Sequence, residues 1–266
     1  HLWILKAQYL YAHRDAYVAY NCKEGYGITA SHKKKSLLSR AKHVIYDRDD
    51  CRWLVKLDQR KCYAHIRTDV FRQEMRYLTT DEAFIQFGVD VAFYKGQLPI
   101  GTPTSPLVHH IVMLRYDAFM RGLCTFGMRY ADDVFMACES REQANRAVWR
   151  TKFFWWYELK LRAKKGGIVQ PISKPIDVCG YIIHKTDADA RGHNKGYCTL
   201  RNYLRRRVRK ATKKNWPSYF GIARHADCFR MMQEREQRMK LQQLTEKIRI
   251  DRHLDAPNID VRDLQG

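Results

Sequence analysis

The segment from Phe126 to Cys138 places two adjacent carboxylates in the middle of an apolar, strand-forming stretch. Bulky side chains lie on either side of Ala131, Asp132 and Asp133, so the pattern predicts a strand, a tight turn and a second strand. Neighbouring carboxylates repel each other unless a cation lies between them. The segment therefore predicts an antiparallel sheet with a metal-binding hairpin, and the alternative is an ordinary polar turn.

A second apolar stretch, Arg52 to Asp58, ends in another acid, 132 − 58 = 74 positions before Asp132. A site for two metal ions about 3.5 to 4 Å apart needs carboxylates from more than one strand. Asp58, Asp132 and Asp133 are therefore the candidate catalytic and metal-binding residues. The other interpretation, in which Asp58 only terminates its strand, stays open here.

The composition favours a polyanionic partner. The chain has 266 residues and a formal net charge of +21, a self-repulsion that bound phosphates would neutralise. Nucleic acid is the expected partner. An acidic membrane surface is the alternative, but the sequence has no long apolar span and no signal-peptide core, so we expect a cytoplasmic protein without membrane contact. The eight cysteines are scattered without metal-ligand spacing, as is typical of reduced intracellular thiols.

Helices and strands alternate through the middle of the chain, which predicts a mixed α and β structure. We expect helices over 69–78 and 80–94, the second capped by Thr80 or Asp81, and a helix with Ser105 as N-cap and Pro106 first that runs to Arg121. Further predictions are a helix over 139–160 with core aromatics at 153–156, a strand over 176–183, an exposed amphipathic helix over 233–252, and a frayed tail after residue 254. The start at His1 within an apolar segment indicates a fragment.

Three motifs in order, the strand that ends in Asp58, the loop that ends in Ser105-Pro106, and Tyr130 to Asp133, resemble the palm of reverse transcriptases. The resemblance implies an α+β fold, that of a right-hand polymerase with a palm of antiparallel sheet plus helices, partial fingers and a helical thumb. The implied domains are partial fingers at 1–50, palm with embedded fingers helices at 51–188, a basic thumb at 189–254, and a tail at 255–266. The implied enzyme is an RNA-directed DNA polymerase, a nucleotidyltransferase that takes an RNA template, a primer and dNTPs.

Within that family the chain is similar to bacterial retroelement enzymes, through residues 16–27, and to those of diversity-generating retroelements in bacteria, archaea or phages. The second likeness rests on Ile100, where most relatives carry Gln, and on the thumb-like run 217–230. Pro106 and Ala131 depart from that subfamily, which usually has Gln and often Met there. The subfamily implies mutagenesis at template adenines and a small basic accessory variability protein. A retron-like, group II intron-like or antiphage-defence reverse transcriptase, or an inert RNA-binding relative, is the alternative.

The resemblance also implies roles for single residues. Asp58 and Asp132 would hold two Mg²⁺ ions, or Mn²⁺ in their place, with Asp133 coordinating less directly. Tyr63 would lie beneath the incoming sugar and exclude a 2′-hydroxyl, unless it is a core tyrosine. Either Lys164 or Lys165 would protonate the leaving pyrophosphate. The substrate-binding residues implied in all are Tyr63, Ile100, Gly101, Ser105, Tyr130 and Lys165.

A strongly basic run lies between residues 201 and 214. On a thumb helix it would contact the phosphate backbone of template and primer, with salt-dependent and sequence-independent affinity. The alternative is a solvated charged face. The candidate nucleic-acid-binding residues are Arg201, Arg205, Arg206, Arg207, Arg209 and Lys210.

Overall fold

The computed structural model describes residues 3–7, 37–186 and 196–254. The chain divides into two compact units, His1–Tyr197 and Cys198–Gly266. The retroelement-like segment 16–27 and the expected tail after residue 254 lie outside the described residues. The finer division into fingers, palm and thumb stays a prediction.

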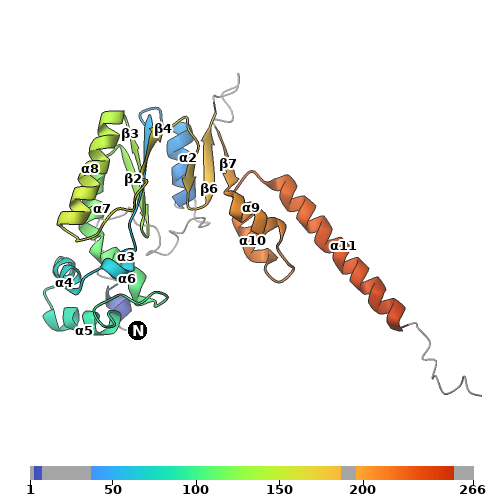
Figure 1. Ribbon diagram of the computed structural model, residues 1–266, viewed down its shortest axis with the longest axis horizontal. Helices are drawn as coiled ribbons and strands as arrows, with labels where there is room; N and C mark the ends of the chain where they lie inside the picture. The colour runs from blue at the N-terminus through green and yellow to red at the C-terminus, as the bar shows by residue number, and fades with distance from the viewer. Residues whose placement is uncertain (1–2, 8–36, 187–195, 255–266) are drawn as a thin grey trace, which may run out of the picture. The chain divides into compact units, whose positions relative to one another are not determined.

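An antiparallel four-stranded sheet forms the centre of the first unit (Figure 1). Its strand order is β2-β3-β1-β4, so the two strands that carry the acids lie side by side in the interior of the sheet. The expected strand before Asp58 and the expected hairpin are both confirmed. The bounds are β1 Trp53–Asp58, β2 Phe126–Tyr130, β3 Asp133–Cys138 and β4 Ile168–Pro171.

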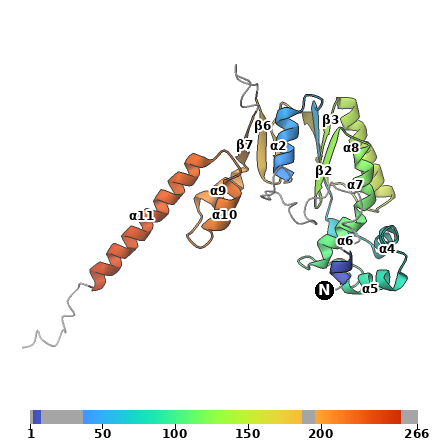
Figure 2. The ribbon, with the colours of Figure 1, turned by 180° about the vertical axis from the view of Figure 1, so that it is seen from behind.

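Helices cover both faces of this sheet (Figures 1 and 2). One face packs against α7 (Leu114–Arg121) and α8 (Arg141–Tyr157), and the other faces α2 (Leu37–Asp47). Side chains alternate along a strand, so every second residue of β1 and β3 enters the core under α7 and α8. These buried residues are Val55, Leu57, Val134, Met136 and Cys138. The remaining positions, including the acids, lie on the α2 face or at the sheet edge.

Four helices lie beyond the end of the sheet at which the acids are found (Figure 1). They are α3 Cys62–His65, α4 Thr68–Arg76, α5 Glu82–Ala92 and α6 Thr104–Val112. The α5 cap is confirmed, because the Asp81 carboxylate accepts a hydrogen bond of 2.9 Å from the Phe84 backbone N–H. Trp3, in the helical turn at residues 3–7, stacks on Phe84 and closes this part of the core.

Two expectations about α6 are wrong. Pro103 holds the cap position, and Ser105 lies inside the first turn, where its hydroxyl donates to the Pro99 carbonyl at 2.6 Å. The helix also does not continue to Arg121, because Met113 (φ −86°, ψ −1°) interrupts it and α7 begins at the next residue.

Two further expectations are corrected. Residues 176–183 are not one strand but a hairpin of β5 (Ile176–Val178) and β6 (Tyr181–Lys185), which turns at Cys179 and Gly180 with positive φ. β7 (Gly196–Leu200) lies beside β6, and the first unit ends at its second residue. Of the four aromatics at 153–156, only Trp155 is fully buried and Phe154 is partly buried. Phe153 and Trp156 are exposed because they lie on the outer face of α8.

The second unit contains three helices among its described residues: α9 Asn202–Arg209, α10 Trp216–Ala223 and α11 Phe229–Leu254. The expected long C-terminal helix is confirmed. Leu204 and Val208 bury the inner side of α9, and all the basic residues of the run from Arg201 to Lys214 are exposed.

The α+β prediction is therefore confirmed, with an antiparallel sheet and helices in one unit and helices in the other. None of the described helices combines the length and the apolar character that crossing a bilayer requires.

Candidate functional site

The three predicted acids meet at one end of the central sheet. Asp58 is the last residue of β1, and its register partner across the antiparallel pair is Asp133, the first residue of β3. Register partners project to the same face of a sheet, so these two carboxylates are neighbours. Asp132 lies in the turn between β2 and β3, and the Gln59 backbone N–H donates to its carbonyl at 3.2 Å.

The turn itself holds an uncommon backbone conformation. Ala131 has a φ of 48°, in the left-handed region that costs a residue with a Cβ roughly 1–2 kcal/mol. The Arg129 guanidinium donates to the Ala131 carbonyl at 2.9 Å, so a buried side chain fixes this turn through a hydrogen bond. The surrounding structure therefore fixes the position of the acid-bearing turn.

Asp58 and Asp133 each face a lysine. Lys164 Nζ lies 3.0 Å from Asp58 Oδ2, and Asp58 is the main reason that the pKa of Lys164 is raised. Lys56 Nζ lies 3.9 Å from Asp133 Oδ1 and 3.5 Å from Asp177 Oδ1. The site is thus built as a cluster of acids with cationic groups close to it.

Burial raises the pKa of both hairpin carboxyls. For Asp132 the nearby Asp58 carboxylate adds to the effect, and for Asp133 the Lys56 ammonium opposes it. In the described part of the chain, no three His, Cys, Asp or Glu side chains are arranged to enclose a metal ion as they stand. The donor set nevertheless fits a hard divalent cation, because it consists of carboxylate oxygens whose crowding and burial disfavour their charged forms.

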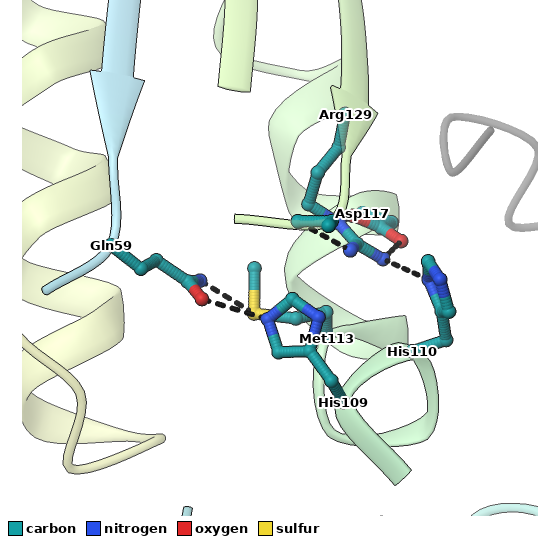
Figure 3. Close-up of polar contacts among 7 residues, drawn as sticks. Gln59, His109, His110, Met113, Asp117 and Arg129 are labelled. Carbon is teal, nitrogen blue, oxygen red and sulfur yellow. Dashed lines mark hydrogen bonds and ion pairs between the residues drawn. The ribbon is translucent and has the colours of Figure 1, made fainter. Parts of the chain in front are cut away.

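A buried ion pair supports the hairpin (Figure 3). Arg129 and Asp117, which belong to β2 and α7, are both fully buried and joined by two hydrogen bonds of 2.7 and 2.6 Å. Arg129 also lies 3.2 Å from His110 Nδ1, which must accept because a guanidinium only donates. The pKa values of His109 and His110 are lowered well below 6.5, by burial first and by the Arg129 charge next.

A second polar chain holds the residue after Asp58 (Figure 3). The Gln59 amide lies 2.8 Å from His109 Nε2 and donates to Met113 Sδ at 3.0 Å. The His109 ring in turn meets the Tyr63 ring edge-on, with centroids 5.7 Å apart. The predicted sugar-contacting tyrosine is therefore held against α6, which also carries His110 of the neighbouring network.

The remaining predicted substrate residues lie in the loop before α6, in α6 itself, at the end of β2 and in the stretch before β4. Ile100 is 86% exposed, and Gly101 has a φ of 91° that suits only glycine well. Ser105 is buried and bonded to its own loop, while Tyr130 is half-buried at the end of β2. Lys165 is exposed, and Lys164 is the one of the two lysines that contacts Asp58. The roles proposed for these residues stay predictions.

The predicted nucleic-acid-binding residues belong to the second unit. Arg201 and Arg207 lie over the Tyr203 ring, at 5.8 and 5.7 Å from its centroid. The six candidate residues are exposed along α9 and its ends, and they stay a prediction as phosphate contacts.

Sequence reasoning missed three residues around the acids: Lys56, Asp117 and Arg129. Arg129 carried one usable signal, since it occupies an inward-facing position of an otherwise apolar strand. A charge at such a position needs a buried partner. Nothing in the sequence indicated that Asp117, in a helix 12 residues earlier, would be that partner.

Comparison with known proteins agrees with this arrangement. The family model described as "Reverse transcriptase (RNA-dependent DNA polymerase)" matches residues 8–183, which include all three acids. A search of curated protein sequences gives no match.

Two solved structures share the fold. Apo telomerase from Candida tropicalis is 9% identical, with a TM-score of 0.52 over 69% of this chain and 38% of that one. Telomerase from Candida albicans, in complex with a TWJ fragment of telomeric RNA, is 13% identical, with a TM-score of 0.50 over 79% and 42%. This chain thus spans about two fifths of the length of those proteins. The palm-like sheet with its helices and the match over most of the sequence place the chain in the reverse transcriptase (RNA-dependent DNA polymerase) family.

Proposed function

We propose that this protein synthesises DNA on an RNA template by two-metal nucleotidyl transfer. The observation that carries the proposal is the pairing of Asp58 with Asp133 across adjacent strands, with Asp132 in the turn between β2 and β3. Reverse transcriptases as a family use divalent metal ions, an RNA template and dNTPs. Asp58 and Asp132 would hold two Mg²⁺ ions, with Asp133 as a weaker ligand.

When bound, the two ions would supply an activated primer 3′-hydroxyl and charge stabilisation for the leaving pyrophosphate. The side chains position the reactants. Tyr63, held by the His109 ring, offers a fixed surface beneath the incoming sugar. Lys164, which contacts Asp58, would donate a proton to the departing phosphate oxygen. Burial of Asp117 and Arg129 keeps the hairpin in place while these groups act.

Extension of a primer on an RNA template, with Mg²⁺ and the complete protein, tests this proposal. The Asp132→Ala/Asp133→Ala variant is the control, and the loss of metal ligands should lower the rate at least about a thousandfold, equivalent to about 4 kcal/mol. Supplying rNTPs instead of dNTPs tests the sugar selection assigned to Tyr63. Equal extension by the protein and the variant would refute polymerisation at these acids and favour an inert RNA-binding relative.

For the subfamily, we propose an enzyme of a diversity-generating retroelement that copies template adenines loosely, with a small basic accessory variability protein as partner. The support is Ile100: its aliphatic side chain is 86% exposed in the loop before α6, where an amide would offer hydrogen bonds to the nascent pair.

The test of the subfamily is the Ile100→Gln variant, sequenced after copying a defined RNA. Misincorporation should fall opposite template adenine by about tenfold, the worth of one net hydrogen bond, and change little opposite other bases. An unchanged error pattern would favour the alternative, a retron-like, group II intron-like or antiphage-defence enzyme. Ile100→Leu is the matched control, since it keeps the aliphatic character.

A further inference from the structure

Besides the basic residues of α9, the protein has a second basic site, which lies in the first unit next to Asp58, Asp132 and Asp133. It is a cavity of about 760 Å³, within the size range of small-molecule sites. No aspartate or glutamate lines it. The lining residues that carry the argument are Arg60, Arg67, Trp156, Tyr157, Lys160 and Arg162.

The backbone explains why this cavity adjoins the acids. Residues 58–60 run antiparallel to 162–164, since the Arg60 N–H donates to the Arg162 carbonyl and the Lys164 N–H donates to the Asp58 carbonyl, both at 2.8 Å. Gln59 and Ala163 form the bridge between them, and the Gln59 side chain is buried. Side chains alternate along such a pair, so Arg60 and Arg162 share the outward face with Asp58 and Lys164.

Two of the four cations in the cavity already have polar partners. Arg67 pairs with Asp69 at 2.7 Å, and Lys160 Nζ donates to the Tyr157 carbonyl at 2.8 Å. Arg60 and Arg162 have no acidic partner among the described residues. Like charges placed opposite each other on paired strands are destabilising, so a bound anion would relieve the repulsion. A guanidinium pair suits a phosphate in particular, because each fork can bind two oxygens.

The cavity also offers aromatic surface. Trp156 and Tyr157 are 54% and 60% exposed, although they are among the largest apolar side chains of α8. The Arg162 guanidinium lies 4.7 Å from the Trp156 ring centroid, which fixes the ring beside the cationic groups. Aromatic rings next to arginines are the combination that holds a nucleobase and its phosphate, with about 1–3 kcal/mol for each stacked base.

We propose that this cavity is a nucleotide-binding site separate from the three carboxylates. Phosphate oxygens would bind Arg60 and Arg162, and the base would stack on Trp156 or Tyr157. A free nucleotide and a nucleotide within a single strand share this chemistry. The proposal does not depend on polymerisation, because the binding groups include none of the proposed metal ligands.

Calorimetric titration of the complete protein in EDTA tests the site, since removal of divalent metal suppresses nucleotide binding at the acids. The ligands are dTTP and an eight-residue oligo-dT, at 0.15 M salt. The Arg60→Gln/Arg162→Gln variant should bind at least about tenfold more weakly, as expected for the loss of two charge-assisted contacts. The matched control is Arg146→Gln/Arg150→Gln, which removes equal charge from exposed positions of α8 outside the cavity.

Comparing dTTP with oligo-dT shows whether the site takes a free nucleotide or a nucleotide within a single strand. A loss with dTTP identifies free nucleotide, and a loss with oligo-dT alone identifies a single strand. Losses no larger than those of the control with both ligands, or no binding by the unaltered protein, would overturn the proposal. The Trp156→Leu variant tests the base contact independently, and an unchanged Kd would contradict stacking there.

Discussion

The buried Asp117–Arg129 ion pair supports the β2-β3 hairpin without being one of the proposed metal ligands. Its contribution to stability can therefore be measured separately from the catalytic role of the acids. Both side chains are fully buried and joined by hydrogen bonds of 2.6 and 2.7 Å. Replacing either partner alone, as in Asp117→Leu or Arg129→Met, leaves one charge without compensation. Such losses cost about 3–5 kcal/mol, which is a large part of a stability of about 5–15 kcal/mol.

The double variant should behave differently. If the two losses were independent, they would sum to roughly 6–10 kcal/mol, but an apolar pair of similar volume is often neutral within a few kcal/mol. We therefore expect the double variant to be more stable than either single variant, with urea unfolding as the assay. Extension activity should stay low, because the Arg129 contact with the Ala131 carbonyl is lost. Single losses below about 1 kcal/mol, or additive losses in the double variant, would refute this account.

Two further predictions concern titratable groups near the acids. Lys164→Ala should lower the rate of single-nucleotide addition about a hundredfold, while Lys165→Ala changes it less than threefold, because Lys164 is the lysine that contacts Asp58; equal effects in rapid-quench assays would contradict the assignment. The lowered pKa values of His109 and His110 keep both neutral in the folded state, whereas the unfolded chain takes up protons near pH 6.5. The free energy of unfolding should therefore be greatest above pH 6.5. Below that pH, where the unfolded histidines are protonated, it should fall by about 1.4 kcal/mol per pH unit for each histidine. The His110→Asn variant should remove about half of that slope in urea titrations.

The parts of the fold that sequence predicted well depend on local patterns. The apolar run before Asp58 and the bulky residues around the acid pair predict β1 and the β2-β3 hairpin, and the order of the motifs predicts that the acids meet. Asp81 caps α5 as a local rule expects. Where tertiary contacts decide, local rules failed: Ser105 bonds its own loop instead of capping α6.

The contacts that support the site could not be predicted from local sequence patterns for the same reason. Asp117 and Arg129 pair across 12 residues, and Lys164 reaches Asp58 across 106. Such partners are brought together by the packing of α7 on the sheet and by the strand-like pairing of 58–60 with 162–164, neither of which has a signal in sequence spacing. Gly180 was a visible turn signal in the stretch 176–183, and its positive φ explains why that stretch is a hairpin.

The count of bound Mn²⁺ tests the central claim most directly, since it reports the metal site without relying on turnover. Electron paramagnetic resonance of the complete protein, with a primer that lacks its 3′-hydroxyl, an RNA template and the next dNTP, should show two bound Mn²⁺ ions per protein. Asp132→Ala/Asp133→Ala should lose both, while Lys165→Ala keeps them. Retention of two ions by the double aspartate variant would contradict the assignment of Asp58, Asp132 and Asp133 as one two-metal site.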